Sequence, residues 1–154
     1  MVLLEQGEVS QELVGFAGEV SMMLEDTSEL GDARAVAREF LVSLRAVPGL
    51  PVSQQAFGMV QLVVTELVTN ARKYAPGPCL MTLEVCEDDV AVSVWDSCPS
   101  LPLILPADPA RVGQHGLEIV TAVCRSFEIH REPVGKRIKA VVALTDDPVG
   151  RQVL

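Results

Sequence analysis

The stretch that decides the fold is QLVVTELVTNARKYA, which spans residues 61–75. At about 100° per residue, apolar side chains in and just before this stretch form one stripe along a helix, which predicts packing on a core. The stripe consists of Val60, Val64, Leu67, Val68, Ala71 and Ala75. A second apolar stripe of Met59, Leu62 and Val63 lies on the opposite side. We therefore expect a helix that is covered on two faces.

Three polar residues interrupt the second stripe. Glu66 and Asn70 are spaced i and i+4 and project from the same side of the helix, and Lys73 follows one turn later. A carboxylate and a carboxamide among apolar neighbours are costly to bury unless a metal, a phosphate or a water satisfies them. Periodicity alone leaves an alternative, in which Glu66 and Lys73 frame the helix surface and Asn70 bonds to solvent.

Composition limits the class of protein. A chain of 154 residues, 49% of them hydrophobic, fits one domain with a real core. The net charge of −9 argues against a nucleic-acid surface, which needs basic residues to neutralise phosphates. No apolar run approaches the ~18 residues of a membrane span, and the first residues lack the pattern of a signal peptide. We therefore expect a cytoplasmic protein with no membrane attachment.

The four cysteines show no metal-binding spacing. Cys79, Cys86, Cys98 and Cys124 stand far apart, without a C-x-x-C pair or matching histidines. This pattern predicts reduced, buried thiols rather than a zinc site.

The first half of the chain is predicted to contain a strand and two helices. A short apolar run predicts a strand at residues 20–24, and possible N-caps at 26–28 precede a helix that ends near Val47. The apolar positions of that helix are Ala35, Ala37, Phe40, Leu41 and Leu44. Ser53 is the predicted N-cap of the central helix, which ends near Ala75 before prolines.

The second half is predicted to be strand-rich. Strands are expected at residues 79–86, 90–95, 127–130 and 138–144, with a hairpin turn at 87–89. Residues 99–109 contain four prolines, so we expect a loop. A loop of this length is often a lid, and a disordered segment is the alternative. A helix is predicted at 116–125, with Leu117, Ile119, Val120 and Val123 buried.

This order of elements predicts an α+β fold. Helices on one face of a mixed, mainly antiparallel sheet form a two-layer sandwich, with space for a ligand between the layers. We expect residues 1–18 to be an extension of doubtful order, residues 19–145 to form the domain, and residues 146–154 to be a loose tail.

The central helix carries a family resemblance. Glu66-x-x-x-Asn70-Ala71-x-Lys73-Tyr74 resembles the helix motif of the histidine-kinase-like ATPase superfamily, whose Bergerat fold has the same element order over residues 19–145. The resemblance implies ATP and Mg²⁺ as cofactors, Asn70 as the metal ligand and Lys73 as a phosphate contact. Sensor kinases of the superfamily usually have Asn at the first position. Glu66 instead resembles the branch of anti-sigma-factor serine/threonine kinases, where the carboxylate is the general base.

Two further segments resemble the family's pattern. Asp96 follows a strand and resembles the Asp that reads the amino group of adenine, although residues 96–99 read DSCP where Asp-x-Gly-x-Gly is usual. From the residue alone, a turn cap is the alternative. Residues 135–137 occupy the place of a third glycine box, with Lys and Arg where small hydroxyl residues are commoner.

Residues 113–117 resemble the second glycine box. The resemblance implies that Gly113, His115, Gly116 and Leu117 contact the phosphates, since backbone amides at a helix start receive anions. A flexible lid hinge is the alternative explanation of these glycines. Arg111 is expected to reach the γ-phosphate from the lid, and a surface arginine is its alternative.

These features lead to hypotheses from different classes. The first is an anti-sigma-type protein kinase, whose partners would be a sigma factor and a small antagonist protein and which the resemblance implies as a homodimer. The second is a binding module of the same fold, with nucleotide structural or absent. Intact Glu66, Asn70 and Lys73 favour the kinase, whereas the missing glycines favour the module. A sensor-kinase fragment is a third reading, disfavoured by Glu66 and by the lack of a phospho-accepting His helix.

Overall fold

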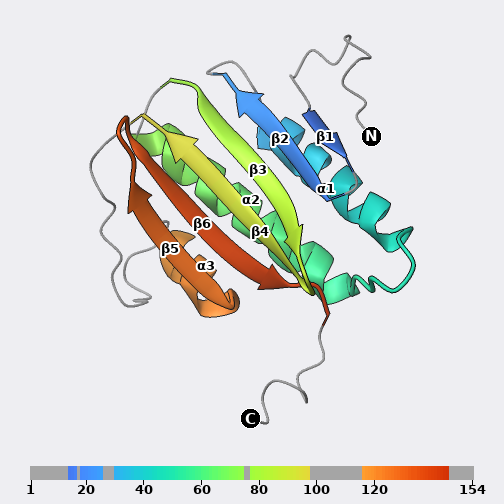
Figure 1. Cartoon of the computed structure of the whole chain (residues 1–154). Coiled ribbons are helices and arrows are strands. Elements are labelled where there is room, and N and C mark those ends of the chain that lie inside the picture. Colours follow the sequence, from blue (N-terminus) through green and yellow to red (C-terminus); the bar gives the residue numbers. More distant parts are fainter. Residues whose placement is uncertain (1–13, 17, 26–29, 75–76, 98–115, 146–154) are drawn as a thin grey trace.

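The structure, a computed structural model, describes residues 14–16, 18–25, 30–74, 77–97 and 116–145. Its elements in chain order are β1 (Val14–Phe16), β2 (Glu19–Leu24), α1 (Leu30–Arg45), α2 (Gln54–Tyr74), β3 (Cys79–Cys86), β4 (Asp89–Asp96), α3 (Gly116–Val123), β5 (Ser126–Arg131) and β6 (Lys136–Ala143). The strands form one sheet in the order β1-β2-β3-β4-β6-β5, and the helices lie on one face of it (Figure 1). The predicted α+β sandwich is confirmed, and all pairings between these strands are antiparallel.

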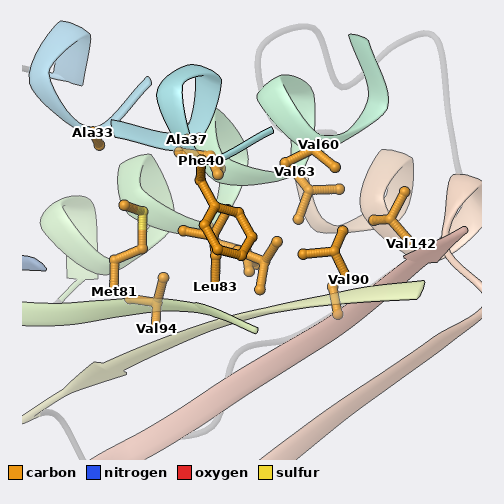
Figure 2. Close-up of a cluster of buried hydrophobic side chains, with 14 of the residues drawn as sticks. Ala33, Ala37, Phe40, Val60, Val63, Met81, Leu83, Val90, Val94 and Val142 are labelled. Carbon is orange, nitrogen blue, oxygen red and sulfur yellow. The ribbon is translucent and has the colours of Figure 1, made fainter. Parts of the chain in front are cut away.

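Helix α2 lies at the centre of the helical layer and packs on β3, β4 and β6. Its predicted core stripe is buried from Val60 to Ala71, and Val63 of the second stripe is buried as well. Met59 of that second stripe packs on the core while remaining partly exposed. Figure 2 shows the cluster, in which α1 contributes Phe40 and the sheet contributes Met81, Leu83, Val90, Val94 and Val142. These mostly aliphatic side chains form one core cluster between the two layers.

Contacts at its first turn fix the direction of α2. Oγ of Ser53 accepts a hydrogen bond from the backbone N–H of Ala56 at 2.9 Å, as the predicted N-cap requires. The backbone N–H of Ser53 donates to the carbonyl of Leu144 at 2.8 Å, just beyond the end of β6. The helix therefore starts where β6 ends, and its C-terminal turns reach the opposite end of the sheet, where β4 ends and β6 begins (Figure 1).

Several details differ from the sequence predictions. Strand β1 was not predicted; it pairs with β2 in the register Val14↔Ser21. In α1 the buried position is Ala33 rather than the exposed Ala35, because the stripe runs at i, i+4, i+7, i+8 and i+11 from Ala33. Ile119 is 38% exposed because Leu117 and Val120 form the buried side of the short α3. Cys86 is exposed, so its predicted burial is wrong.

Some predictions fall outside the described residues. They concern the caps at 26–28, the lid at 99–109, Cys98, most of the N-terminal extension and the tail at 146–154. Among the helices that are described, none is both long enough and apolar enough to cross a membrane.

Candidate nucleotide-binding site

The polar residues singled out on α2 lie at one end of the sandwich. Glu66, Asn70 and Lys73 belong to the C-terminal half of α2, which reaches the end of the sheet where β4 terminates at Asp96. Helix α3 lies on the side of α2 away from α1 (Figure 1). It ends at Val123, and just beyond it the backbone N–H of Arg125 donates to the carbonyl of Val141 late in β6, so the start of α3 at Gly116 points back toward the beginning of β6.

Asn70 and Glu66 lie on the side of α2 turned away from α1. On the opposite side, Nε of Arg34 in α1 donates to Oε1 of Gln61 at 3.3 Å. Asn70 follows Gln61 by nine residues, which at about 100° per residue places it on the far side of the helix. Helix α3 also lies on that side of α2 (Figure 1), and the two helices are in contact. Both Glu66 and Asn70 are half-buried, whereas Lys73 is exposed.

Asn70 presents an unsatisfied oxygen. Its Oδ1 atom is fully buried and has no hydrogen-bond partner among the described residues. A buried carbonyl oxygen without a partner costs about 1–3 kcal/mol, so such atoms in native proteins ordinarily meet a ligand, a metal or a water. Amide oxygens are among the hard ligands that Mg²⁺ accepts, and Mg²⁺ usually takes only one or two protein ligands. The residues on this side of α2 therefore fit a magnesium-bound phosphate group.

Asp96 is engaged in a buried ion pair. Nζ of Lys136 lies 3.1 Å from Oδ1 of Asp96, and the two side chains are 2% and 1% exposed. The two residues face each other in the β4–β6 ladder. From the sequence, Asp96 is predicted at a strand end and Lys136 is unusual for its position. Nothing in the sequence predicts an ion pair between them. That contact depends on the strand register, which residue spacing does not specify.

The turn before β6 holds Lys136 in this position. Gly135 has φ +84°, and a Cβ there would overlap the carbonyl oxygen of Asp96 and lie 2.7 Å from Cα of Ser97. The backbone N–H of Glu132 donates to the carbonyl of Gly135 at 3.0 Å, which closes the turn. A glycine is required at this point because only it combines a positive φ with so close an approach of two backbones.

Of the predicted phosphate loop, only its last two residues are described. Gly116 begins α3, and Leu117 is buried at 6% exposure. Leu117 therefore contacts the core through its side chain, and a phosphate contact at this residue would have to come from its backbone. Arg111, Gly113 and His115 lie outside the described residues.

Two of the described thiols, Cys86 and Cys124, are poor nucleophiles. Cys79, Cys86 and Cys124 are present as thiols in the described part of the chain. Burial raises the pKa of Cys124 to about 11, so its thiol is almost entirely protonated at neutral pH. Burial, with Glu84 as the next cause, also raises the pKa of Cys86. Thiol chemistry at Cys86 and Cys124 is thus disfavoured.

Fold and site together define a two-layer α+β domain with half-buried polar groups of α2 at one end of the sheet. Residues 26–142 match the family model of the histidine kinase-like ATPase domain. The chain belongs to this family, and nucleotide binding follows as its general property. A search of curated proteins gave no match.

One solved structure that the chain resembles is the histidine kinase domain of a blue-light activated histidine kinase from Erythrobacter litoralis. The TM-score is 0.44 and the sequence identity is 17%. The alignment covers 73% of this chain and 61% of that chain, so this chain spans less than two thirds of that domain's length.

Proposed function

We propose that this protein is a Mg²⁺- and ATP-dependent serine/threonine kinase of the anti-sigma-factor type. The observation that carries the proposal is the buried, unpartnered Oδ1 atom of Asn70, with the half-buried carboxylate of Glu66 one turn earlier on the same side of α2. Membership of the histidine kinase-like ATPase family supports the nucleotide part of the proposal. The Glu at position 66 supports the serine/threonine part, through the resemblance of its motif to the anti-sigma branch.

In this proposal Asn70 would hold the metal and Lys73 would contact the phosphates. When bound, Mg²⁺ would supply positive charge that stabilises the negative charge developing during phosphoryl transfer. The exposed ammonium of Lys73 at the C-terminal end of α2 adds a second positive charge on the same helix. The backbone at the start of α3 would provide amide donors to phosphate oxygens.

Glu66 would act on the hydroxyl of the protein substrate. It precedes Asn70 by four residues, so its carboxylate lies about one helical turn from the metal ligand. A carboxylate at that distance would accept a hydrogen bond from an incoming Ser or Thr hydroxyl, orient it and take its proton. The substrate would be a small antagonist protein, and the second partner would be a sigma factor, with a homodimer as the expected assembly.

The test compares wild type with Glu66→Gln. Glutamine keeps the size of the side chain but cannot act as a base, so we expect unchanged Mg-ATP affinity and a loss of phosphoryl transfer of about 10²–10⁴-fold. Binding is measured by calorimetry. The protein partner is first copurified from the native cell, in the absence or presence of ATP. Phosphoryl transfer to this partner is then measured with radiolabelled ATP. Glu39→Gln, at an exposed position of α1, is the matched control and should behave as wild type.

A second candidate is a binding module of the same fold that does not transfer phosphate. The buried Asp96–Lys136 pair and the missing glycines after Asp96 favour it, because both depart from the family's adenine pocket. If wild type binds Mg-ATP but labels no copurifying partner, the module is correct and the kinase is not. Absence of any nucleotide binding would remove the kinase proposal entirely.

A further inference from the structure

A buried lysine lies beside Asp96, the residue to which the family resemblance assigns recognition of the adenine amino group. Lys136 is 1% exposed, and its ammonium lies 3.1 Å from Oδ1 of Asp96. We propose that Lys136 determines nucleotide specificity: it holds the Asp96 carboxylate in an ion pair and thereby prevents it from selecting adenine. This inference rests on the nucleotide-binding function proposed above. Its consequence is that the protein accepts ATP and GTP almost equally.

The position of the pair makes it relevant to the nucleotide. Side chains alternate along β6, and Ile138, Ala140 and Val142 face the helices and the core. Lys136 shares their face, as Asp96 shares the face of Val94 and Val92 on β4. The pair therefore lies between the layers, at the sheet end that the C-terminal half of α2 also reaches (Figure 1).

The pair is held firmly in place. The ladder sets Asp96 directly opposite Lys136, and Gly135 packs against the carbonyl of Asp96. Both side chains are almost fully buried, so neither is in contact with solvent in this arrangement. The ion pair is consequently a fixed part of the sandwich rather than a surface contact.

The Lys136 ammonium is a stronger hydrogen-bond donor to Asp96 than the amino group of adenine. The bond from the Lys136 ammonium to the Asp96 carboxylate is charged at both donor and acceptor, whereas a bond from an adenine amino group would be charged at the acceptor alone. An adenine amino group is a neutral donor, and it would meet a carboxylate whose charge the ammonium already compensates through Oδ1. Separating a buried ion pair is strongly unfavourable, because it leaves a charge without compensation. The amino group of adenine therefore adds little to binding, and the triphosphate, which ATP and GTP share, supplies most of the affinity.

The test is the substitution Lys136→Thr, which places a small hydroxyl residue in this position. We measure dissociation constants for Mg-ATP and Mg-GTP by calorimetry on the full chain. Wild type should bind the two nucleotides within about threefold of each other. Lys136→Thr should prefer ATP by about tenfold or more, the scale of one hydrogen bond to a charged group. The double variant Lys136→Thr with Asp96→Asn should lose that preference.

Matched controls distinguish the effect of losing the ion pair from the effects of a changed net charge and of misfolding. Lys139→Thr removes the same charge from the opposite face of β6, where Lys139 pairs with Ser93, and should bind both nucleotides as wild type does. Lys136→Gln keeps more of the side-chain length without the charge and should shift preference in the same direction as Lys136→Thr. Circular dichroism and thermal melting establish that each variant is folded, and either Lys136 variant suffices if the other does not fold.

The outcomes are distinct. Wild type that prefers ATP by more than tenfold, with the preference reduced by Lys136→Thr, overturns the inference and leaves the proposed function standing. An unchanged ATP to GTP ratio in both Lys136 variants also overturns it. If neither wild type nor any variant binds either nucleotide, the proposed function fails and the inference fails with it.

Discussion

At the level of single residues, the site contains buried polar atoms. Their burial does not contribute to the stability of the fold. Oδ1 of Asn70 is buried without a partner among the described residues, and Asp96 is buried together with the charge of Lys136. Both arrangements carry a cost in folding free energy, since burial of polar groups is favourable only when their hydrogen bonds are complete. Residues of this kind are typical of sites selected for binding rather than for stability.

Asn70→Ala should separate stability from function. The substitution removes an unsatisfied buried oxygen and introduces a better helix former, so the free energy of unfolding should stay within about 0.5 kcal/mol of wild type or rise. Mg-ATP affinity should fall at least about tenfold, because a metal ligand is lost. Urea unfolding and calorimetry give the two quantities, with Thr69→Ala at an exposed neighbouring position of α2 as the control. A large loss of stability with unchanged affinity would show that Asn70 is structural.

At the level of helices and turns, two glycines have opposite roles. Gly58 lies in α2, and a Cβ added to it would meet nothing within 4 Å, so its flexibility only weakens the helix. Gly135 combines φ +84° with close contact to the backbone of Asp96 and Ser97. The same residue type is therefore dispensable in the helix and necessary in the turn that positions Lys136.

The two alanine variants should change stability in opposite directions. Gly58→Ala should raise the free energy of unfolding by about 0.5–1 kcal/mol, the helix-propensity difference between the two residues. Gly135→Ala should lower it by more than about 2 kcal/mol, because both the positive φ and the overlap with Asp96 are unfavourable. Equilibrium urea denaturation of the purified variants measures both. Equal stability of Gly135→Ala and wild type would mean that the turn rearranges at little cost.

At the level of the complete domain, α2 links the site to the entire core. Helix α2 carries Glu66 and Asn70 on one side. With its buried side it packs on three strands, and it also contacts both α1 and α3. Its first turn is tied to the chain beyond β6 through the hydrogen bond of Ser53 to Leu144. A ligand held by α2 is therefore coupled to the cooperative unfolding of the domain rather than to a local segment.

Mg-ATP should stabilise the whole domain. At a nucleotide concentration one hundred times the dissociation constant, the free energy of unfolding should rise by about 2.7 kcal/mol, because ligand binds only the folded state. ATP with a chelator in place of Mg²⁺ should have a much smaller effect if Asn70 holds the metal. Thermal melting followed by circular dichroism measures the shift. A melting temperature that millimolar Mg-ATP leaves unchanged would contradict nucleotide binding at this site.

Much of the architecture could be predicted from the sequence because it depends on local pattern. The period of Val60, Val64, Leu67 and Ala71 specified α2 and its buried face, and Ser53 specified its first turn. The positions of the prolines and the alternation of apolar and polar residues predicted the bounds of most strands to within about two residues. Strand β1 was missed because three residues carry too little periodicity to distinguish a strand from a loop.

The order of residues along the chain was enough to specify the helix that carries Glu66 and Asn70, the sandwich built around it and the family to which the motif points, since these follow from spacing along one segment. Only the packing of the folded chain revealed that Oδ1 of Asn70 is buried without a partner among the described residues and that Lys136 neutralises Asp96. Asp96 and Lys136 are 40 residues apart in the chain, and their contact arises from the register of β4 against β6. Register is set by the packing of all strands and helices together, so no local pattern reveals it.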